Sequence, residues 1–96
     1  MNNITGYSAQ NNIAGLRQSA DIIDETNEAS GIVYFGFCKP GTTGTNSETW
    51  SICKLTQVAG VSTFLWAQGS ANFNLIFDNR ADYDYIYANF RVVNHG

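Results

Sequence analysis

Two cysteines are the first residues of this chain whose type could support chemistry, because thiolates bind metals and form disulfides. Cys38 and Cys53 lack the C-x-x-C spacing of zinc and redox sites, and no histidine stands near them. They fall on two segments that we expect to pair as strands, so a register that set them opposite each other would allow a cross-strand disulfide. Synthesis in a reducing cytosol favours two buried free thiols instead.

Three carboxylates, those of Asp78, Asp82 and Asp84, stand close together, as the ligands of calcium loops do. The stretch lacks the glycine and the closing glutamate of an EF-hand loop. Because Asp82 and Asp84 share one face of an alternating segment, we interpret them as the solvated side of a strand. We expect no metal and no cofactor.

A catalytic base is hard to find in this sequence. His95, the one histidine, is the penultimate residue, and chain ends seldom hold a base in position. The serines and threonines have neither a supporting histidine nor a G-x-S-x-G elbow. We therefore expect that the protein is not an enzyme.

Aromatic side chains could instead form a platform for sugar rings. Trp50 and Trp66 each stand among apolar residues on an alternating segment, which favours the core over a ligand platform. Tyr83, Tyr85 and Tyr87 share one face of a predicted strand over residues 82–87, and their hydroxyls suit either a ligand or a protein interface. Both interpretations of the tyrosines stay open.

Three segments rich in β-forming residues must position these side chains: 31–39, 50–58 and 61–68. The link Ala59-Gly60 has the length that favours a hairpin. We expect a mainly β fold, either a small antiparallel sheet or a two-layer β sandwich, with one short helical turn and an extended N-terminal arm. The helical turn is predicted from the i, i+3, i+4 spacing of Phe73, Ile76 and Phe77, and it should plug one end of the sheet.

The first strand is apolar on both faces, since Ile32 and Tyr34 point one way while Val33, Phe35 and Phe37 point the other. A lone small sheet cannot bury both faces. Either the strand is central in two layers, or the arm or another copy of the chain covers one face. We expect Arg80 to bond carbonyls at the end of the helical turn or to pair with Asp78. The predicted structural core is Tyr34, Trp50, Ile52, Leu65, Trp66, Phe73, Ile76, Phe77 and Arg80.

Residues 1–30 differ in kind from the rest, because small and polar side chains dominate and the apolar ones are too sparse to build a core. We divide the chain into an arm, 1–30, and a small β domain, 31–96. The arm would be a docked extended segment or would contain a short helix from Ser19 to Thr26. The candidate interface residues are Ile4, Tyr7, Ile13, Leu16, Ile22 and Ile23 in the arm, together with Tyr83, Tyr85 and Tyr87.

Composition narrows the choice of partners. Only 14% of the 96 residues are charged, against about a quarter in soluble domains, which indicates that other protein covers part of the surface. The net charge of −3 and the scattered basic residues argue against a nucleic acid. The chain has neither a signal-peptide pattern nor an apolar run of about 18 residues, so we expect synthesis in the host cytoplasm and no membrane.

Four segments of the chain resemble, in order and spacing, a short β-rich domain found among the structural proteins of tailed bacteriophages and prophages. That group has a glycine-bearing strand, a tryptophan-led strand, a W-A-D-G segment and an F-D-N-x-W-D-x-R-A block. This sequence departs at Gln68, where an acidic residue is expected, and at Phe77, where tryptophan is more usual. The matching segments are residues 34–42, 50–55, 65–69 and 73–81.

The resemblance implies a virion protein of the capsid, the connector or a fibre, and it implies no catalytic residue. Its partners would be other virion proteins and further copies of itself. A homo-oligomer suits a small domain, because each subunit interface adds burial to a modest core. The alternative function is a carbohydrate-binding module for host attachment, using the three tyrosines and Trp66.

Overall fold

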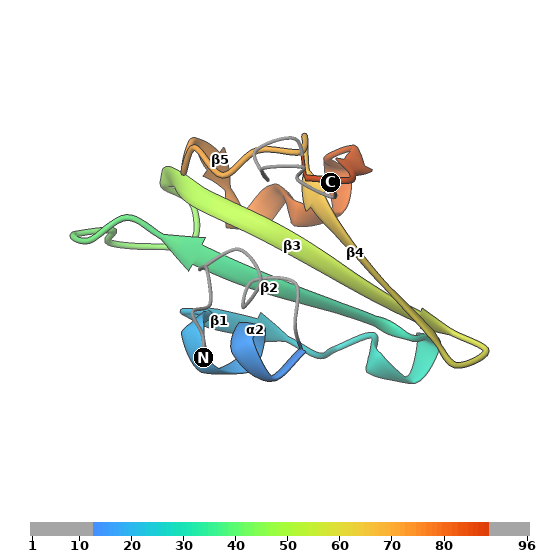
Figure 1. The fold of residues 1–96 in the computed structure, drawn as a ribbon. Helices are drawn as coiled ribbons and strands as arrows, with labels where there is room; N and C mark the ends of the chain where they lie inside the picture. The colour runs from blue at the N-terminus through green and yellow to red at the C-terminus, as the bar shows by residue number, and fades with distance from the viewer. Residues whose placement is uncertain (1–12, 89–96) are drawn as a thin grey trace, which may run out of the picture.

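The computed structural model describes residues 13–88, and these form one antiparallel sheet of six strands with short helical segments on its faces (Figure 1). The strand order is β1-β2-β3-β4-β6, and β5 pairs with β3. The expected mainly β fold with a small antiparallel sheet is therefore confirmed. Within the same residues, no helix is long and apolar enough to cross a membrane. The elements are α2 (Ile13–Ser19), β1 (Ile22–Asp24), the 3-10 helix η1 (Glu28–Ser30), β2 (Ile32–Cys38), β3 (Glu48–Val58), β4 (Val61–Ala67), β5 (Leu75–Ile76), the 3-10 helix η2 (Phe77–Asp82) and β6 (Tyr85–Ile86).

The predicted hairpin at Ala59-Gly60 joins β3 to β4, with Val58 opposite Val61. Ala59 and Gly60 have φ angles of 52° and 82°. Positive φ at both central residues is the pattern of a type I′ turn, whose twist matches that of the flanking strands.

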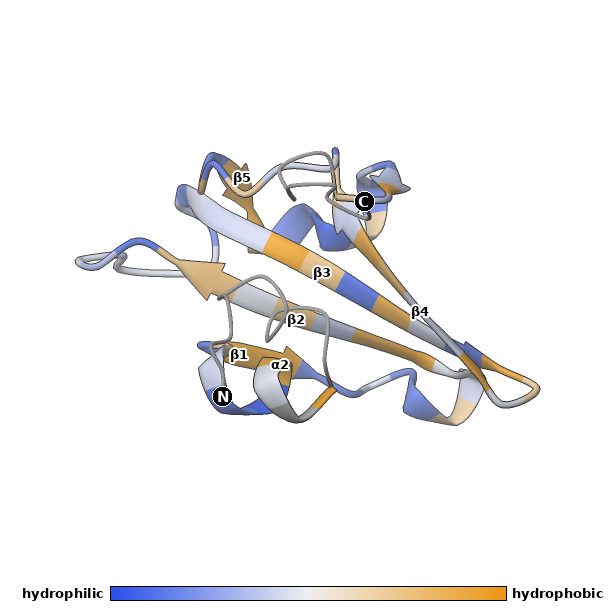
Figure 2. Cartoon of the chain, in the orientation of Figure 1, coloured by the Kyte–Doolittle hydropathy of each residue, from blue (hydrophilic) through white to orange (hydrophobic). Residues whose placement is uncertain are grey.

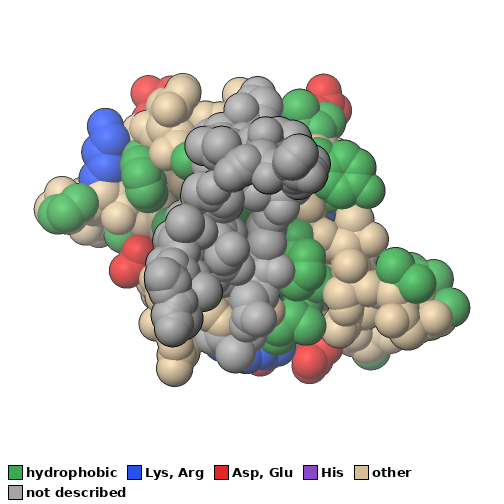
Figure 3. Space-filling model, viewed as in Figure 1, with side chains coloured by type: hydrophobic (Ala, Val, Ile, Leu, Met, Phe, Trp, Pro, Cys, Tyr) green, Lys and Arg blue, Asp and Glu red, His purple; other side chains and the backbone are tan. Residues whose placement is uncertain are grey.

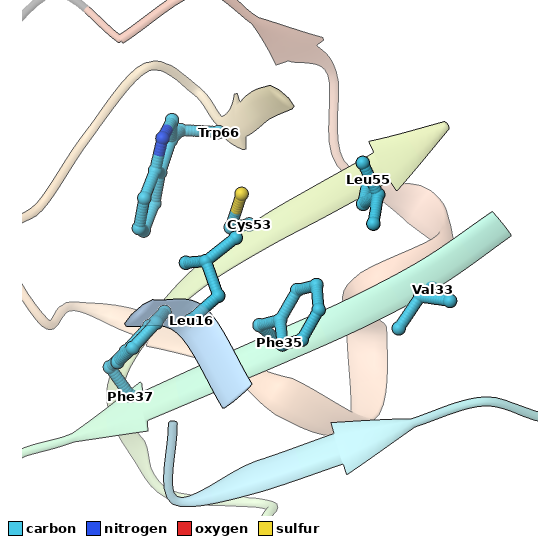
Figure 4. Close-up of a cluster of buried hydrophobic side chains, with 7 residues drawn as sticks. All are labelled: Leu16, Val33, Phe35, Phe37, Cys53, Leu55 and Trp66. Atoms are coloured by element: carbon cyan, nitrogen blue, oxygen red, sulfur yellow. The ribbon is translucent and has the colours of Figure 1, made fainter. Parts of the chain in front are cut away.

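The sheet buries apolar side chains on both faces, which Figure 2 shows as apolar residues recurring along β2 and β3. The first face gathers alternate residues of β2, β3 and β4, and Leu16 of α2 lies among them (Figure 4). The second face is covered by η2, where Phe77 packs beside Trp50 with their ring centroids 5.3 Å apart, and Leu75 of the paired strand β5 is buried there too. Both apolar faces of β2 are thus buried by elements of the same chain. The buried residues of the first face are Leu16, Val33, Phe35, Phe37, Cys53, Leu55 and Trp66; those of the second are Tyr34, Trp50, Ile52, Ala67, Leu75 and Phe77.

Residues 13–30 are part of the sheet domain, so the predicted boundary at residue 30 does not follow the packing. The helix lies at Ile13–Ser19 and not at Ser19–Thr26, where Ile22–Asp24 pair with β2 instead. Leu16 has no exposed surface, so the expectation that it contacts a neighbouring subunit is wrong. The physical reason is that a segment with few apolar residues can still join the core, because the first face of the sheet surrounds Leu16 with apolar side chains.

The predicted helical turn begins later than expected, at Phe77. Leu75 and Ile76 pair with β3 as strand β5, and Phe73 has a φ of 56°, which is outside the helical region. Phe73 packs on the first face of the sheet and Phe77 on the second. Their helical spacing was therefore misleading, because the chain crosses from one face to the other between them.

The residues predicted as core differ in their burial. Tyr34, Trp50, Ile52, Trp66 and Phe77 are buried, whereas Leu65, Phe73, Ile76 and Arg80 are half-buried. The half-buried ones lie near the ends of the sheet or on its later strands, where fewer elements cover them.

Candidate interaction surface

The two cysteines are free and lie on opposite faces of the sheet. Cys38 stands opposite Trp50 in the β2–β3 register, and Cys53 stands opposite Phe35. Burial raises the pKa of both thiols, most strongly that of Cys53. A protonated, enclosed thiol is a poor nucleophile, so the arrangement favours packing over reactivity.

The carboxylates singled out in the sequence are dispersed over the surface. Asp78, Asp82 and Asp84 are exposed. Across residues 13–88, no group of three histidine, cysteine, aspartate or glutamate side chains is arranged to hold a metal ion. His95 lies outside the described residues.

The three tyrosines do not form one exposed row. The Tyr83 hydroxyl accepts a hydrogen bond from the Ile76 N–H at 2.9 Å, and the Tyr85 hydroxyl donates one to the Arg80 carbonyl at 2.6 Å. Both rings pack against the second face, and burial raises the pKa of Tyr85. Tyr87 is 68% exposed. Tyr83 and Tyr85 thus share a face, as expected, and Asp82, Asp84 and Ile86 are exposed; of the three tyrosines only Tyr87 is an open ring.

Trp66 is also unsuited to a ligand platform, because only 1% of it is exposed. Its ring lies in the first-face core, 5.6 Å from that of Phe37 between centroids. The expectation that Trp66 contributes to a sugar-binding surface is wrong for this packing.

Arg80 ties η2 to the opposite edge of the sheet. Its Nε donates a 2.8 Å hydrogen bond to Asp24 of β1, and its Nη1 donates one to the Phe77 carbonyl at 3.1 Å. The guanidinium also lies over the Phe77 ring, 4.6 Å from its centroid. The predicted bond to a carbonyl of the helical turn is present, whereas the charged partner is Asp24 and not Asp78. These contacts serve the fold, since the guanidinium is already engaged within the chain.

The two edges of the sheet differ in a way that matters for association. The β1 edge is three residues long and is flanked by the exposed charges of Arg17 and Glu25, which pair with each other. Short length and charge are two means by which proteins protect a sheet edge. At the other side the last strand, β6, pairs only with Trp66 and Ala67 of β4. Strand β4 has seven residues and carries no charge and no proline.

Exposed apolar side chains stand at both ends of β4. Among the described residues, the large apolar side chains that stay exposed are Val58 (69%), Val61 (63%), Ile86 (48%) and Tyr87 (68%). Val58 and Val61 form the cross-strand pair at the tip of the β3–β4 hairpin, and Ile86 belongs to β6, which pairs with β4. Figure 3 shows apolar side chains at the end of the molecule where this hairpin projects. We call β4 with these four residues the β4 surface.

The residues predicted to form an interface are only partly represented on this surface. Tyr87 belongs to it, whereas Ile13, Ile22, Ile23, Tyr83 and Tyr85 are half-buried elsewhere in the chain, and Ile4 and Tyr7 lie outside the described residues. Val58, Val61 and Ile86 were missed. The signal for Val58 and Val61 was present, because a valine on each side of a two-residue turn stands at a projecting hairpin tip.

No protein-family model matches the chain, and no curated protein or solved structure shows significant similarity to it. The resemblance to phage structural proteins therefore stays a prediction.

Proposed function

We propose that this protein is a structural component of a bacteriophage virion, which acts by associating with further copies of itself and with other virion proteins. Its place in the particle would be the head surface, a fibre or the head–tail region. The protein would act by binding other proteins and not by catalysing a reaction.

The observation that carries the proposal is the β4 surface. This surface is a long uncharged strand flanked by exposed valine, isoleucine and tyrosine side chains. Contact with another protein would stabilise it, because burial of apolar area is favourable. Proteins that act alone protect such an edge with lysine, proline or a bulge. The resemblance of residues 31–85 to virion proteins gives this surface a biological setting.

Particles purified from a host that encodes the chain provide the test. Mass spectrometry of gradient-purified virions should detect peptides of this protein in a constant ratio to the major capsid protein. A protein that is abundant in the lysate and absent from the particles would contradict the proposal.

A matched pair of variants locates the contact. Val61→Lys places a charge on the β4 surface, so we expect its incorporation into particles to fall. Thr43→Lys places the same charge on an exposed loop between β2 and β3 and should be incorporated normally. Normal incorporation of both variants would show that particles hold the protein by another surface.

Deletion of residues 1–30 is not a suitable test of docking. It would remove β1, the buried Leu16 and the Asp24 partner of Arg80, so the sheet itself would lose support. A gripping role for the part of the arm that precedes residue 13 stays a prediction.

A further inference from the structure

The outer side of β4 is open over residues 61–65, the part of the strand that lies next to the hairpin turn. Strand β6 pairs only with Trp66 and Ala67, so no strand of the described residues lies on the outer side of residues 61–65, the side away from β3 (Figure 1). Figure 1 shows this part of β4 running out to the projecting tip with β3 on one side only.

The hairpin determines which backbone groups point outward. A two-residue turn makes Val58 and Val61 a hydrogen-bonded pair, so the backbone of Val61, Thr63 and Leu65 bonds to β3. The N–H and C=O groups of the intervening Ser62 and Phe64 then point away from β3, towards the open side of β4 in the plane of the sheet. The same alternation continues to Gln68, whose N–H donates outward to the Asp84 carbonyl at 2.7 Å.

We propose that two copies of this chain pair their β4 edges antiparallel about Thr63, so that their sheets become one. This inference deepens the proposed function by naming the partner, and its test needs only the purified protein.

The open edge is complementary to itself in that register. Residues 61–65 are centred on Thr63, so self-pairing about this residue uses the whole open edge. Ser62 then stands opposite the partner's Phe64, and these two residues exchange both backbone hydrogen bonds, as hydrogen-bonded pairs do in antiparallel sheets. A shift by one residue would set outward groups against inward ones and would form no such bonds.

The side chains agree with the same register. On the second face Thr63 would meet the partner's Thr63, and Val61 would meet the partner's Leu65; threonine pairs and apolar pairs both stabilise neighbouring strands. On the first face Phe64 would lie beside the partner's Ser62. No charged side chain of β4 is brought against its own copy, because the strand has none.

The register also brings exposed apolar residues of the two copies towards each other. It places the hairpin tip, with Val61, at the end of the partner's β6, next to which Tyr87 is exposed. Ile86 is not part of this contact, because it pairs with Trp66 and so points to the first face, whereas Val61 points to the second.

A charge exchange at Thr63 tests the proposal directly. Light scattering of the purified chain should give twice 10.5 kDa at high concentration. Thr63→Lys and Thr63→Glu should each give the mass of one chain, because the like charges face each other across the axis. An equimolar mixture of the two variants should recover the doubled mass.

Thr56→Lys is the matched control. Thr56 is the β3 neighbour of Thr63 on the same face, but its copy lies three strand spacings away, about 14 Å, beyond a physiological screening length of about 8 Å. This variant should keep the doubled mass. If circular dichroism showed that Thr63→Lys does not fold, Ser62→Pro would serve as the test variant instead, since proline at this position removes an N–H that points outward and not one bonded to β3.

Amide exchange distinguishes this pairing from its rivals. The Ser62 and Phe64 amides should be protected in wild type and should exchange rapidly in Thr63→Lys. Three results would overturn the inference: the mass of one chain at millimolar concentration, an undiminished doubled mass in Thr63→Lys, or protected Ser62 and Phe64 amides in a monomer. The last would mean that another segment of the same chain occupies the edge. Virion incorporation is measured separately, so a pair that never enters particles would reject the proposed function and not this inference.

Discussion

Arg80 and Asp24 stand 56 positions apart in the chain, and Arg80 Nε donates a 2.8 Å hydrogen bond to Asp24 Oδ2. Their side chains are 29% and 12% exposed, so the pair is largely shielded from water. It connects η2 to β1 across the second face of the sheet, and Tyr85 adds a bond to the Arg80 carbonyl. These contacts join the two ends of the described chain.

Arg80→Ala should lower the free energy of unfolding by about 1.5–3 kcal/mol, the usual contribution of hydrogen bonds to charged groups. The variant also leaves the Asp24 carboxylate without its partner. Urea unfolding measures the loss. Arg17→Ala is the control, because Arg17 and Glu25 are 40% and 43% exposed and exposed pairs contribute about 1 kcal/mol or less. Equal losses in the two variants would contradict a special role for the shielded pair.

Asp24 should make stability depend on pH in the acid range. Hydrogen bonds from Thr26 and the Arg80 guanidinium hold the pKa of Asp24 below its ordinary value of 3.8, although burial acts in the opposite sense. Because the folded carboxyl binds its proton less readily than the unfolded one, its contribution is complete above about pH 5 and is lost as the pH falls through 3.8 towards the folded value. Asp24→Asn should therefore be less stable than wild type at neutral pH, and the difference should shrink in acid. A constant gap between Asp24→Asn and wild type across this pH range would refute the linkage.

The β3–β4 turn contains a residue that can be improved. Ala59 has a φ of 52°, a conformation that costs an L-residue with a Cβ about 1–2 kcal/mol and costs glycine little. Ala59→Gly should therefore raise the free energy of unfolding by about 0.5–1 kcal/mol. Gly60→Ala should lower the free energy of unfolding, because φ is 82° there. No neighbouring atom lies within 4 Å of the added Cβ, so backbone strain and not a clash would be the cause. Thermal unfolding reports both signs, and a gain in both variants would exclude backbone strain as the cause.

Gly36 lets η2 pack closely on the sheet. A Cβ at this position would lie 2.7 Å from Phe77 Cδ1 and 3.0 Å from Trp50 Cε3. Gly36→Ala should cost about 1–3 kcal/mol of stability, as overpacking usually does. The cost should be smaller when Phe77→Leu is already present, because the ring that meets the new methyl is gone. A double-mutant cycle measures this coupling, and additive losses would mean that the two residues do not compete for space.

Local patterns were sufficient for the strands and the hairpin. The β-forming residues of segments 31–39, 50–58 and 61–68, and the two-residue link at Ala59-Gly60, depend on neighbours along the chain, so they could be interpreted without a fold. The candidate surface was predictable only in part. Tyr87 belonged to the residues expected at an interface. Val58 and Val61 flank the two-residue turn and could have been placed at its tip, whereas Ile86 looks like an ordinary strand residue until the sheet order is known.

The sequence by itself determined a small antiparallel β domain whose first strand is apolar on both sides, because side-chain alternation and turn length are local properties. Only the tertiary structure decided what covers those two sides: α2 on one and η2 on the other. It separated Phe73 from Phe77, and it paired Arg80 with Asp24. It also left β4 as the open edge, because strand order arises from competition among distant segments for burial and backbone partners, which no local pattern records.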